Sequence, residues 1–224
     1  MTGKALDLDA VVVGAGAVGL AIGRALAQSG LDTLVIESQP RHGMGTSSRN
    51  SGVIHAGLYY PPGSNKANWC VEGRELLYAF CRSHQVAHRQ LGKLIVGQHE
   101  DVAALQTIAS RAKDAGVENL RWLSQNELKT MEPEVRAHHA LFSPSTGIVD
   151  VHELMLALEG EIEKAGGNVV TQSCFLAATP LGASACQGWQ LDIKVGQQES
   201  HRLSCQLLIN AAGLDADAVA NRIE

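Results

Sequence analysis

The feature that most constrains the fold is a Gly-x-Gly-x-x-Gly pattern at residues 14–19. It follows the apolar run 9–13 and precedes residues 20–28, which are predicted to form a helix. A second apolar run at 33–36 completes a strand, turn, helix and strand within about 30 residues, the size of a βαβ unit. The start of the chain therefore predicts a parallel α/β sheet of the Rossmann type.

Each glycine of this pattern has its own physical role. Gly14 permits a sharp turn, Gly16 lets the backbone approach a diphosphate, and Gly19 allows close packing of helix on strand. Glu37 follows at about the 20-residue spacing expected for an acid that accepts a ribose hydroxyl, and its charge disfavours the 2′-phosphate of NADP. The pattern predicts a dinucleotide site but does not separate FAD from NAD. The alternative is a structural turn that binds nothing.

Composition and charge exclude several classes of protein. The chain has 224 residues, and its 45% hydrophobic content is enough for a buried core. A net charge of -5 argues against nucleic acid as a partner. The uncharged stretch 10–23 ends at Arg24, short of the ~20 residues of a membrane helix, so no transmembrane segment is expected and only peripheral membrane contact is left open.

The cysteines and histidines give no metal site and no disulfide framework. The cysteine count is five, which is odd, and no two cysteines form a Cys-x-x-Cys pair, which favours the reducing cytoplasm. His138 and His139 are adjacent in sequence and are not expected to face one another. No metal ligand is therefore assigned. The cysteines are Cys70, Cys81, Cys174, Cys186 and Cys205.

The rest of the chain mixes predicted strands and helices, which is typical of an α/β protein. Ser64 is predicted to cap a helix that ends near Ser83, and apolar residues on more than one face predict that this helix is well buried. The Gly- and Ser-rich stretch 39–63 is a long loop of the kind that has a function. The other predicted helices begin at 101, 124 and 150, and the other predicted strands are 91–97, 169–175, 189–195 and 203–210.

Four sequence blocks point to a known family: Thr46–Tyr60 (TSSRNSGVIHAGLYY), Gly92–Val96, Ser143–Asp150 and Leu208–Gly213. With these blocks, the chain resembles the D-amino-acid-oxidase-like flavoprotein superfamily. Within it, the chain is most similar to the family of L-2-hydroxyglutarate dehydrogenases and oxidases. Members of this family are longer than this chain, so the resemblance covers only their N-terminal portion.

The resemblance implies a Rossmann-type FAD/NAD(P)-binding domain with an inserted, partial α+β substrate domain. Residues 1–90 would form the first part of the FAD-binding domain, residues 91–149 the substrate-domain segment, and residues 150–224 the second part of the FAD-binding domain. It also implies FAD as cofactor and oxidation of a small 2-hydroxy acid, L-2-hydroxyglutarate, to 2-oxoglutarate. Hydride would pass to flavin N5, and dioxygen or a quinone would accept the electrons.

Three other functions stay open at this point. One is an amine or amino-acid oxidase of the same superfamily. A second is a truncated, non-catalytic fragment that binds only the ADP half of FAD. A third is an NAD-dependent dehydrogenase, which would bind no flavin.

The resemblance assigns a set of cofactor contacts beyond the glycines and Glu37. Hydroxyl and backbone N–H groups of the loop suit a phosphate or flavin, although such residues also favour ordinary turns. Arg49 could instead be a solvated surface charge that does not contact the cofactor. Small residues after the last strand would let the backbone approach the cofactor. The set is Thr46, Ser47, Ser48, Arg49, Asn50, Ser51, Phe175 on the adenine side, Ala211, Ala212 and Gly213.

His55 is the strongest candidate for proton transfer. The resemblance places it near the flavin, where a neutral imidazole could accept the hydroxyl proton of the substrate. Related dimethylglycine and sarcosine dehydrogenases attach flavin covalently through a histidine in a similar setting. A hydrogen-bonded histidine without a proton-transfer role is the third interpretation.

A dicarboxylate substrate also needs cationic partners. Arg74, Lys93 and Lys66 are the candidates, and arginine gives the best bidentate geometry. Arg74 shares a helix face with apolar residues, so its charge requires either the substrate or an internal carboxylate. Tyr59 and Tyr60 are candidates for the pocket wall, with ordinary packing as the alternative.

Overall fold

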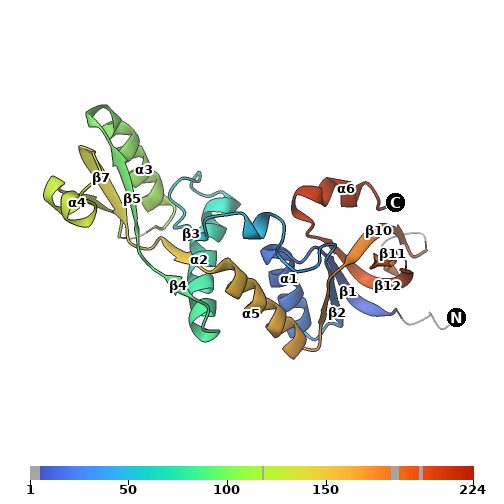
Figure 1. Ribbon diagram of the computed structural model, residues 1–224. Helices are drawn as coiled ribbons and strands as arrows, with labels where there is room; N and C mark the ends of the chain where they lie inside the picture. The colour runs from blue at the N-terminus through green and yellow to red at the C-terminus, as the bar shows by residue number, and fades with distance from the viewer. Residues whose placement is uncertain (1–5, 118, 183–186, 197–198) are drawn as a thin grey trace. The chain divides into compact units, whose positions relative to one another are not determined.

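The computed structural model describes residues 6–117, 119–182, 187–196 and 199–224 (Figure 1). The chain divides into two compact units. The first unit combines Met1–Asn50 with Val151–Glu224, and the inserted unit is Ser51–Asp150.

The first boundary between the units differs from the expected division after residue 90. Strand β3 (Val53–Ile54) pairs with β8 (Gly147–Val149), which lies almost 100 residues further along the chain. The hydroxyl of Tyr78 also donates to the carbonyl of Ser145 at 3.2 Å. Residues 51–90 therefore pack with the inserted segment, although they precede it in sequence.

The first unit is built on a six-stranded sheet in the order β10-β11-β12-β1-β2-β9. Strands β12, β1, β2 and β9 run parallel, and β10, β11 and β12 form an antiparallel meander. Together with its helices, this mixed sheet confirms the predicted α/β class of Rossmann type. The strands are β1 (Leu8–Val13), β2 (Thr33–Ile36), β9 (Asn168–Val170), β10 (Ser173–Pro180), β11 (Trp189–Val195) and β12 (Glu199–Asn210).

Two helices of the first unit pack against each other beside this sheet. Helix α1 (Ala17–Gln28) and helix α5 (Val151–Lys164) lie side by side in Figure 1. A Cβ atom on Gly23 of α1 would lie 2.6 Å from the Val35 side chain and 3.2 Å from that of Ile162, so a glycine permits this close approach. The short helices η4 (Gly213–Asp215) and α6 (Ala216–Ala220) follow β12.

The single strand predicted over 169–175 is wrong. Strand β9 ends at Val170, and β10 begins at Ser173. Gln172 between them has a φ of 52°, a left-handed conformation that ends one strand and starts the other in a new direction. Val169 and Val170 of β9 and Cys174 and Phe175 of β10 are apolar on either side of this short polar corner, so the apolar pattern alone does not reveal the break.

The inserted unit contains two small sheets. Strands β3, β8 and β4 (His88–Arg89) form one sheet, and β5, β7 and β6 form the other. The bounds of the remaining elements are β5 (Lys93–Gly97), β6 (Arg121–Leu123), β7 (His139–Ser143), η2 (His99–Asp101), α2 (Asn65–Ser83), α3 (Val102–Asp114) and α4 (Gln125–Met131).

Local signals set the helices of the inserted unit. The Ser64 hydroxyl accepts the Ala67 N–H at 3.2 Å and caps α2 as predicted. Ser124 and Glu127 form the predicted capping box at the start of α4. The predicted burial of α2 on more than one face is wrong, because Trp69 is 68% exposed and Leu76 is 63% exposed.

Among the described residues, no helix is long and apolar enough to cross a membrane. Within those same residues, no three His, Cys, Asp or Glu side chains are grouped to hold a metal ion. Cys70, Cys81, Cys174 and Cys205 are free thiols, and Cys186 lies outside the described residues.

Candidate functional site

The three glycines of the first unit form the corner between β1 and α1. Gly14 has a φ of +107°, and its N–H donates to the Ile36 carbonyl at 2.8 Å. A Cβ atom on Gly14 would lie 2.6 Å from the Ala211 carbonyl oxygen, and one on Gly19 would collide with the carbonyl of Gly14. The corner therefore closes only with glycine at both positions, as the sequence predicts.

Gly16 has a different environment, at the N-terminus of α1. It is the N-cap of the helix and makes no side-chain capping hydrogen bond. A Cβ atom on Gly16 would have only the Ser47 hydroxyl oxygen near it, at 3.1 Å. That oxygen accepts the N–H of Ala17 at 3.0 Å. The helix N-terminus is thus approachable on the Gly16 side, where its partial positive charge suits a diphosphate.

Glu37 lies at the end of β2 beside the glycine corner. Its Oε2 accepts the N–H of Ala15 at 2.9 Å, and its Oε1 accepts the N–H of Gln39 at 2.9 Å. These bonds fix the direction of the carboxylate. Oε1 also accepts the Ser38 hydroxyl at 3.2 Å, so Oε2 is the oxygen with a further lone pair for a ribose hydroxyl.

The loop after Glu37 brings its hydroxyl residues to the same place. Residues Thr46–Ser48 form the short helix η1, and the Asn50 side-chain amide donates to the Ser47 carbonyl at 2.7 Å. A Cβ atom on Gly213 would lie 3.8 Å from the Thr46 hydroxyl oxygen, so the last predicted block reaches this loop. The Ala211 N–H donates to the Val13 carbonyl at 2.9 Å, beside the glycine corner.

The remaining residues predicted to contact the cofactor lie less centrally. Arg49 is exposed, and its N–H closes η1 on the Thr46 carbonyl at 3.1 Å. Ser51 is exposed and begins the inserted unit. Phe175 of β10 is 5% exposed and packs in the core of the first unit with Val11, Ile36 and Ile193, which leaves little of its ring for an adenine.

Together, these residues of the first unit fit the ADP half of a dinucleotide. The corner offers a helix N-terminus that no side chain of Gly16 covers, together with hydroxyl groups and one acid. We name this group the nucleotide cradle and define it as Gly14, Gly16, Gly19, Glu37, Thr46, Ser47, Ser48, Ala211, Ala212 and Gly213.

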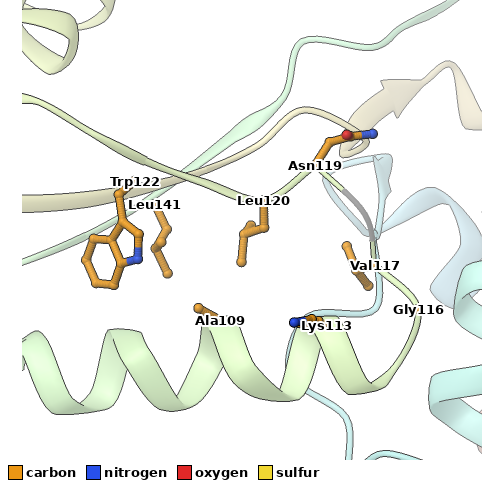
Figure 2. A pocket seen from close by; sticks show the side chains of 8 residues that line it. All are labelled: Ala109, Lys113, Gly116, Val117, Asn119, Leu120, Trp122 and Leu141. Carbon is orange, nitrogen blue, oxygen red and sulfur yellow. The ribbon is translucent and has the colours of Figure 1, made fainter.

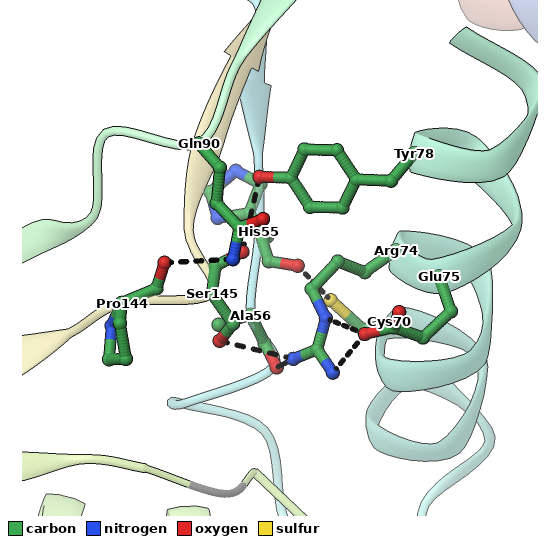
Figure 3. A network of polar contacts seen from close by, with 9 residues as sticks. All are labelled: His55, Ala56, Cys70, Arg74, Glu75, Tyr78, Gln90, Pro144 and Ser145. Carbon is green, nitrogen blue, oxygen red and sulfur yellow. Dashed lines mark hydrogen bonds and ion pairs between the residues drawn. The ribbon is translucent and has the colours of Figure 1, made fainter. Parts of the chain in front are cut away.

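Arg74 is the centre of a polar network in the inserted unit (Figure 3). Its side chain is 9% exposed and pairs with Glu75 at 2.7 Å. Its Nη1 donates at 3.3 Å both to the Ala56 carbonyl and to the Ser145 hydroxyl. The carboxylate partner is not internal as expected, because the Glu75 side chain is 67% exposed. The guanidinium joins α2 to two neighbouring segments.

His55 lies beside this network. Its backbone carbonyl accepts the Cys70 thiol at 3.5 Å, and the residue itself is exposed. Burial raises the pKa of the Cys70 thiol, against the opposing effect of the Arg74 and Lys66 charges, so this thiol stays protonated at neutral pH and can donate. Burial likewise raises the pKa of the Tyr78 phenol, which donates to the Ser145 carbonyl. The backbone at His55 is therefore held by two hydrogen bonds, one from Cys70 to the His55 carbonyl and one from Arg74 to the Ala56 carbonyl.

The two candidate lysines each lie over a tyrosine ring. The Nζ atom of Lys93 is 4.7 Å from the centre of the Tyr59 ring, and that of Lys66 is 4.7 Å from the centre of the Tyr60 ring. These cation–π contacts hold two positive charges near the loop that follows His55. Lysine contacts with a substrate carboxylate stay a prediction.

A cavity of about 590 Å³ lies elsewhere in the inserted unit (Figure 2). None of the residues predicted for cofactor or substrate lines it. It is mostly apolar, with Lys113 and Asn119 as polar members. Its lining is Ala109, Lys113, Gly116, Val117, Asn119, Leu120, Trp122 and Leu141.

Sequence reasoning missed two features of these sites. Ser145 accepts Arg74 and Tyr78, and its place in the matching block 143–150 was the signal that could have found it. The pairing of His42 Nδ1 with Glu159 Oε2 at 2.8 Å has no signal in the sequence, because 117 residues separate the two.

Comparison with known proteins places nearly the whole chain in one family. The sequence profile of the family described as FAD dependent oxidoreductase matches residues 9–224. The mitochondrial L-2-hydroxyglutarate dehydrogenase of Arabidopsis thaliana is 34% identical over 96% of this chain and 50% of its own length. The protein of the same name from Homo sapiens is 35% identical over 96% of this chain and 48% of its own length.

A solved structure has the same fold. L-alpha-glycerophosphate oxidase from Mycoplasma pneumoniae, with FAD bound, superimposes with a TM-score of 0.85 at 21% identity. The match covers 96% of this chain and 56% of that one. The chain spans about half the length of the curated relatives it matches.

Proposed function

Since the chain belongs to the DAO family of FAD dependent oxidoreductases, we propose that it oxidises a small 2-hydroxy acid. The substrate is L-2-hydroxyglutarate and the product is 2-oxoglutarate. The relatives named above, at 34% and 35% identity, support this choice of substrate. Dioxygen or a quinone is proposed as the electron acceptor.

One observation supports the FAD part of this proposal more than any other. The glycine corner, the Ser47 hydroxyl at the α1 N-terminus and Glu37 at the end of β2 converge in one unit. FAD is the cofactor of the family, and the nucleotide cradle has the groups that its diphosphate and ribose require. The negative charge of Glu37 disfavours a nucleotide with a 2′-phosphate.

When bound, FAD supplies the hydride acceptor for the oxidation. The chain supplies proton acceptance and charge. We propose that a ring nitrogen of His55 accepts the hydroxyl proton of the substrate, because the residue is exposed and its backbone is held by Cys70. Lys66 and Lys93 are proposed to attract the two carboxylates. Arg74, already bonded to three protein acceptors, is proposed to fix the segment next to His55.

The test is an anaerobic titration of the FAD-loaded protein. L-2-hydroxyglutarate is expected to bleach the visible flavin absorption, and dioxygen or a quinone is expected to restore it. Bleaching by sarcosine or a D-amino acid, but not by the 2-hydroxy acid, would replace the proposal with an amine or amino-acid oxidase.

A second candidate function is a fragment that binds FAD without catalysis. The observation that favours it is that the cradle lies wholly in the first unit, while the chain spans half of its relatives. A yellow protein that no 2-hydroxy acid bleaches would support this candidate. A purified protein that releases no FAD on heating would contradict both candidates and favour the NAD-dependent alternative.

The cellular location stays a prediction. The sequence predicts the cytoplasm, whereas the curated relatives are named as mitochondrial proteins. Fractionation of cells that express the tagged full-length gene product would decide it.

A further inference from the structure

The loop from Glu37 to Asn50 contributes Glu37 and the residues Thr46–Ser48 to the nucleotide cradle, and little regular secondary structure holds it. It contains only the three-residue helix η1, yet it places the Ser47 hydroxyl 3.0 Å from the Ala17 nitrogen. The position of that hydroxyl must therefore come from contacts with the rest of the first unit. The start of the loop is held because the Gln172 N–H donates to the Gln39 carbonyl at 3.0 Å.

The middle of the loop is held at Gly43. Its N–H donates to the Ala15 carbonyl at 2.9 Å, and its φ of +69° is one that favours glycine. The buried Met155 side chain of α5 occupies the space that a Cβ atom on Gly43 would need. Both backbone polar groups of Ala15 are thus hydrogen-bonded, since its carbonyl accepts Gly43 and its N–H donates to Glu37. A shift of Gly43 would disturb the glycine corner itself.

The residue before Gly43 makes the remaining contact. His42 Nδ1 lies 2.8 Å from Glu159 Oε2, and the two side chains are only 19% and 20% exposed. Glu159 lies one helical turn after Met155 on α5, so both act from the same face of that helix. Hydrogen bonds with an ionised partner are stronger than neutral ones when largely shielded from water.

We propose that His42 and Glu159 form a clamp that positions the loop from Glu37 to Asn50 over the N-terminus of α1. The pair acts through Gly43 and Ala15, and neither member needs to touch the nucleotide. They are positioning residues for FAD binding, and they couple the α5 helix to the cradle. This inference rests on the proposed binding of FAD but adds two residues that no motif assigns.

The test is a double-mutant cycle on the full chain with two readouts. One is the Kd of ADP, measured by calorimetry, because the cradle faces the ADP half. The other is the rate of tryptic cleavage after Arg41 and Arg49 in the nucleotide-free protein, which reports loop order without any ligand. His42→Ala and Glu159→Ala are each expected to raise the Kd about tenfold and to speed cleavage. The double variant should be no worse than either single one.

Conservative variants separate positioning from a simple loss of stability. His42→Asn keeps a donor near the Nδ1 position and Glu159→Gln keeps an acceptor, so both are expected to restore most of the affinity. Gln28→Ala is the matched control, because it removes the 3.0 Å bond from Gln28 to Glu161, also between α1 and α5 but away from the loop. It should leave both readouts unchanged.

The outcomes distinguish the clamp from the proposed function. If the wild type binds ADP and His42→Ala changes neither Kd nor cleavage, the clamp is overturned and FAD binding stands. If the alanine variants simply unfold, as far-ultraviolet circular dichroism would show, the Asn and Gln variants decide the question: full affinity supports the clamp, and wild-type cleavage with lost affinity overturns it. A wild type that binds neither ADP nor FAD contradicts the proposed function instead.

Discussion

At the scale of single residues, Gly14 and Gly16 are two positions apart but are constrained by different things. Gly14 is fixed by its positive φ and by the Ala211 carbonyl, both of which are internal to the fold. Gly16 has an ordinary φ of −77° and open space on its Cβ side apart from Ser47. The fold alone therefore constrains position 16 less than position 14, and we expect the bound diphosphate to be what requires glycine there.

This difference gives a first prediction. Gly16→Ala is expected to raise the Kd of FAD at least about tenfold, because the new methyl group lies where the diphosphate approaches. The melting temperature should stay close to that of the wild type. Flavin fluorescence quenching measures the Kd, and thermal unfolding followed by circular dichroism measures stability.

Gly160→Ala is the matched control for this substitution. Gly160 lies in α5 with no atom within 4 Å of an added Cβ, so alanine should stabilise the helix by roughly 0.5–1 kcal/mol and leave FAD affinity unchanged. Equal loss of affinity in both variants would show that the effect of Gly16→Ala is not local.

Arg74 allows a second prediction. Arg74→Ala leaves the Ala56 carbonyl and the Ser145 hydroxyl without their shared donor, so it should lower the free energy of unfolding by about 1–3 kcal/mol. Urea titration measures this change. Arg82→Ala, an exposed arginine in the last turn of the same helix, should cost less than about 1 kcal/mol. A stable Arg74→Ala variant with a strongly raised KM would instead support direct contact with the substrate.

At the scale of elements, helix α4 has an acid-sensitive start. Glu127 accepts the Ser124 N–H at 2.8 Å and pairs with Arg121 at 2.7 Å, and these bonds lower its pKa to about 2. In the unfolded chain, this carboxyl returns to its ordinary pKa of 4.5. Its contribution to stability is therefore complete above that value and is lost as the pH falls towards 2.

The third prediction follows from this loss of stability at low pH. Glu127→Gln should be less stable than the wild type near neutral pH, and the difference should shrink as the pH is lowered from about 5 towards 2. Urea unfolding at a series of pH values measures it. Glu163→Gln, at an exposed position of α5, removes the same charge elsewhere and serves as control. A difference that is independent of pH would contradict the assigned role of the carboxylate.

Element boundaries show how far local signals reach. The Ser64 cap and the 124–127 box set the starts of α2 and α4, and both were readable because the capping residues lie within the helix segment itself. The break between β9 and β10 was not readable, because Gln172 adopts its left-handed backbone between two partners that lie far away in sequence. Strand β9 pairs with β2, and β10 pairs with β11.

At the scale of the whole molecule, the nucleotide cradle belongs to only one of the two compact units. All the residues that define it lie within Met1–Asn50 or Val151–Glu224. The inserted unit contains His55, Arg74 and the two lysines. A ligand that consists of the ADP half alone should therefore act on the first unit.

This gives the fourth prediction. ADP is expected to slow amide hydrogen exchange at Ala15, Ala17 and the 43–49 segment, while the amides of α3 and β5–β7 stay unchanged. Adenosine 2′,5′-bisphosphate should protect less well, because its 2′-phosphate meets the Glu37 carboxylate. Equal protection in both units would contradict the assignment of the cradle to the first unit alone.

The sequence by itself determined the βαβ start, the glycine pattern and the family resemblance, because each is recognised from short runs of contiguous residues. The tertiary structure decided where the loop from Glu37 to Asn50 lies. It also decided that Arg74 donates hydrogen bonds to Ala56 and Ser145, and that His42 pairs with Glu159. Those contacts join segments separated by 18 to 117 residues. Periodicity and capping signals act over a turn or two of chain, whereas such pairings arise only when distant segments pack around a common core.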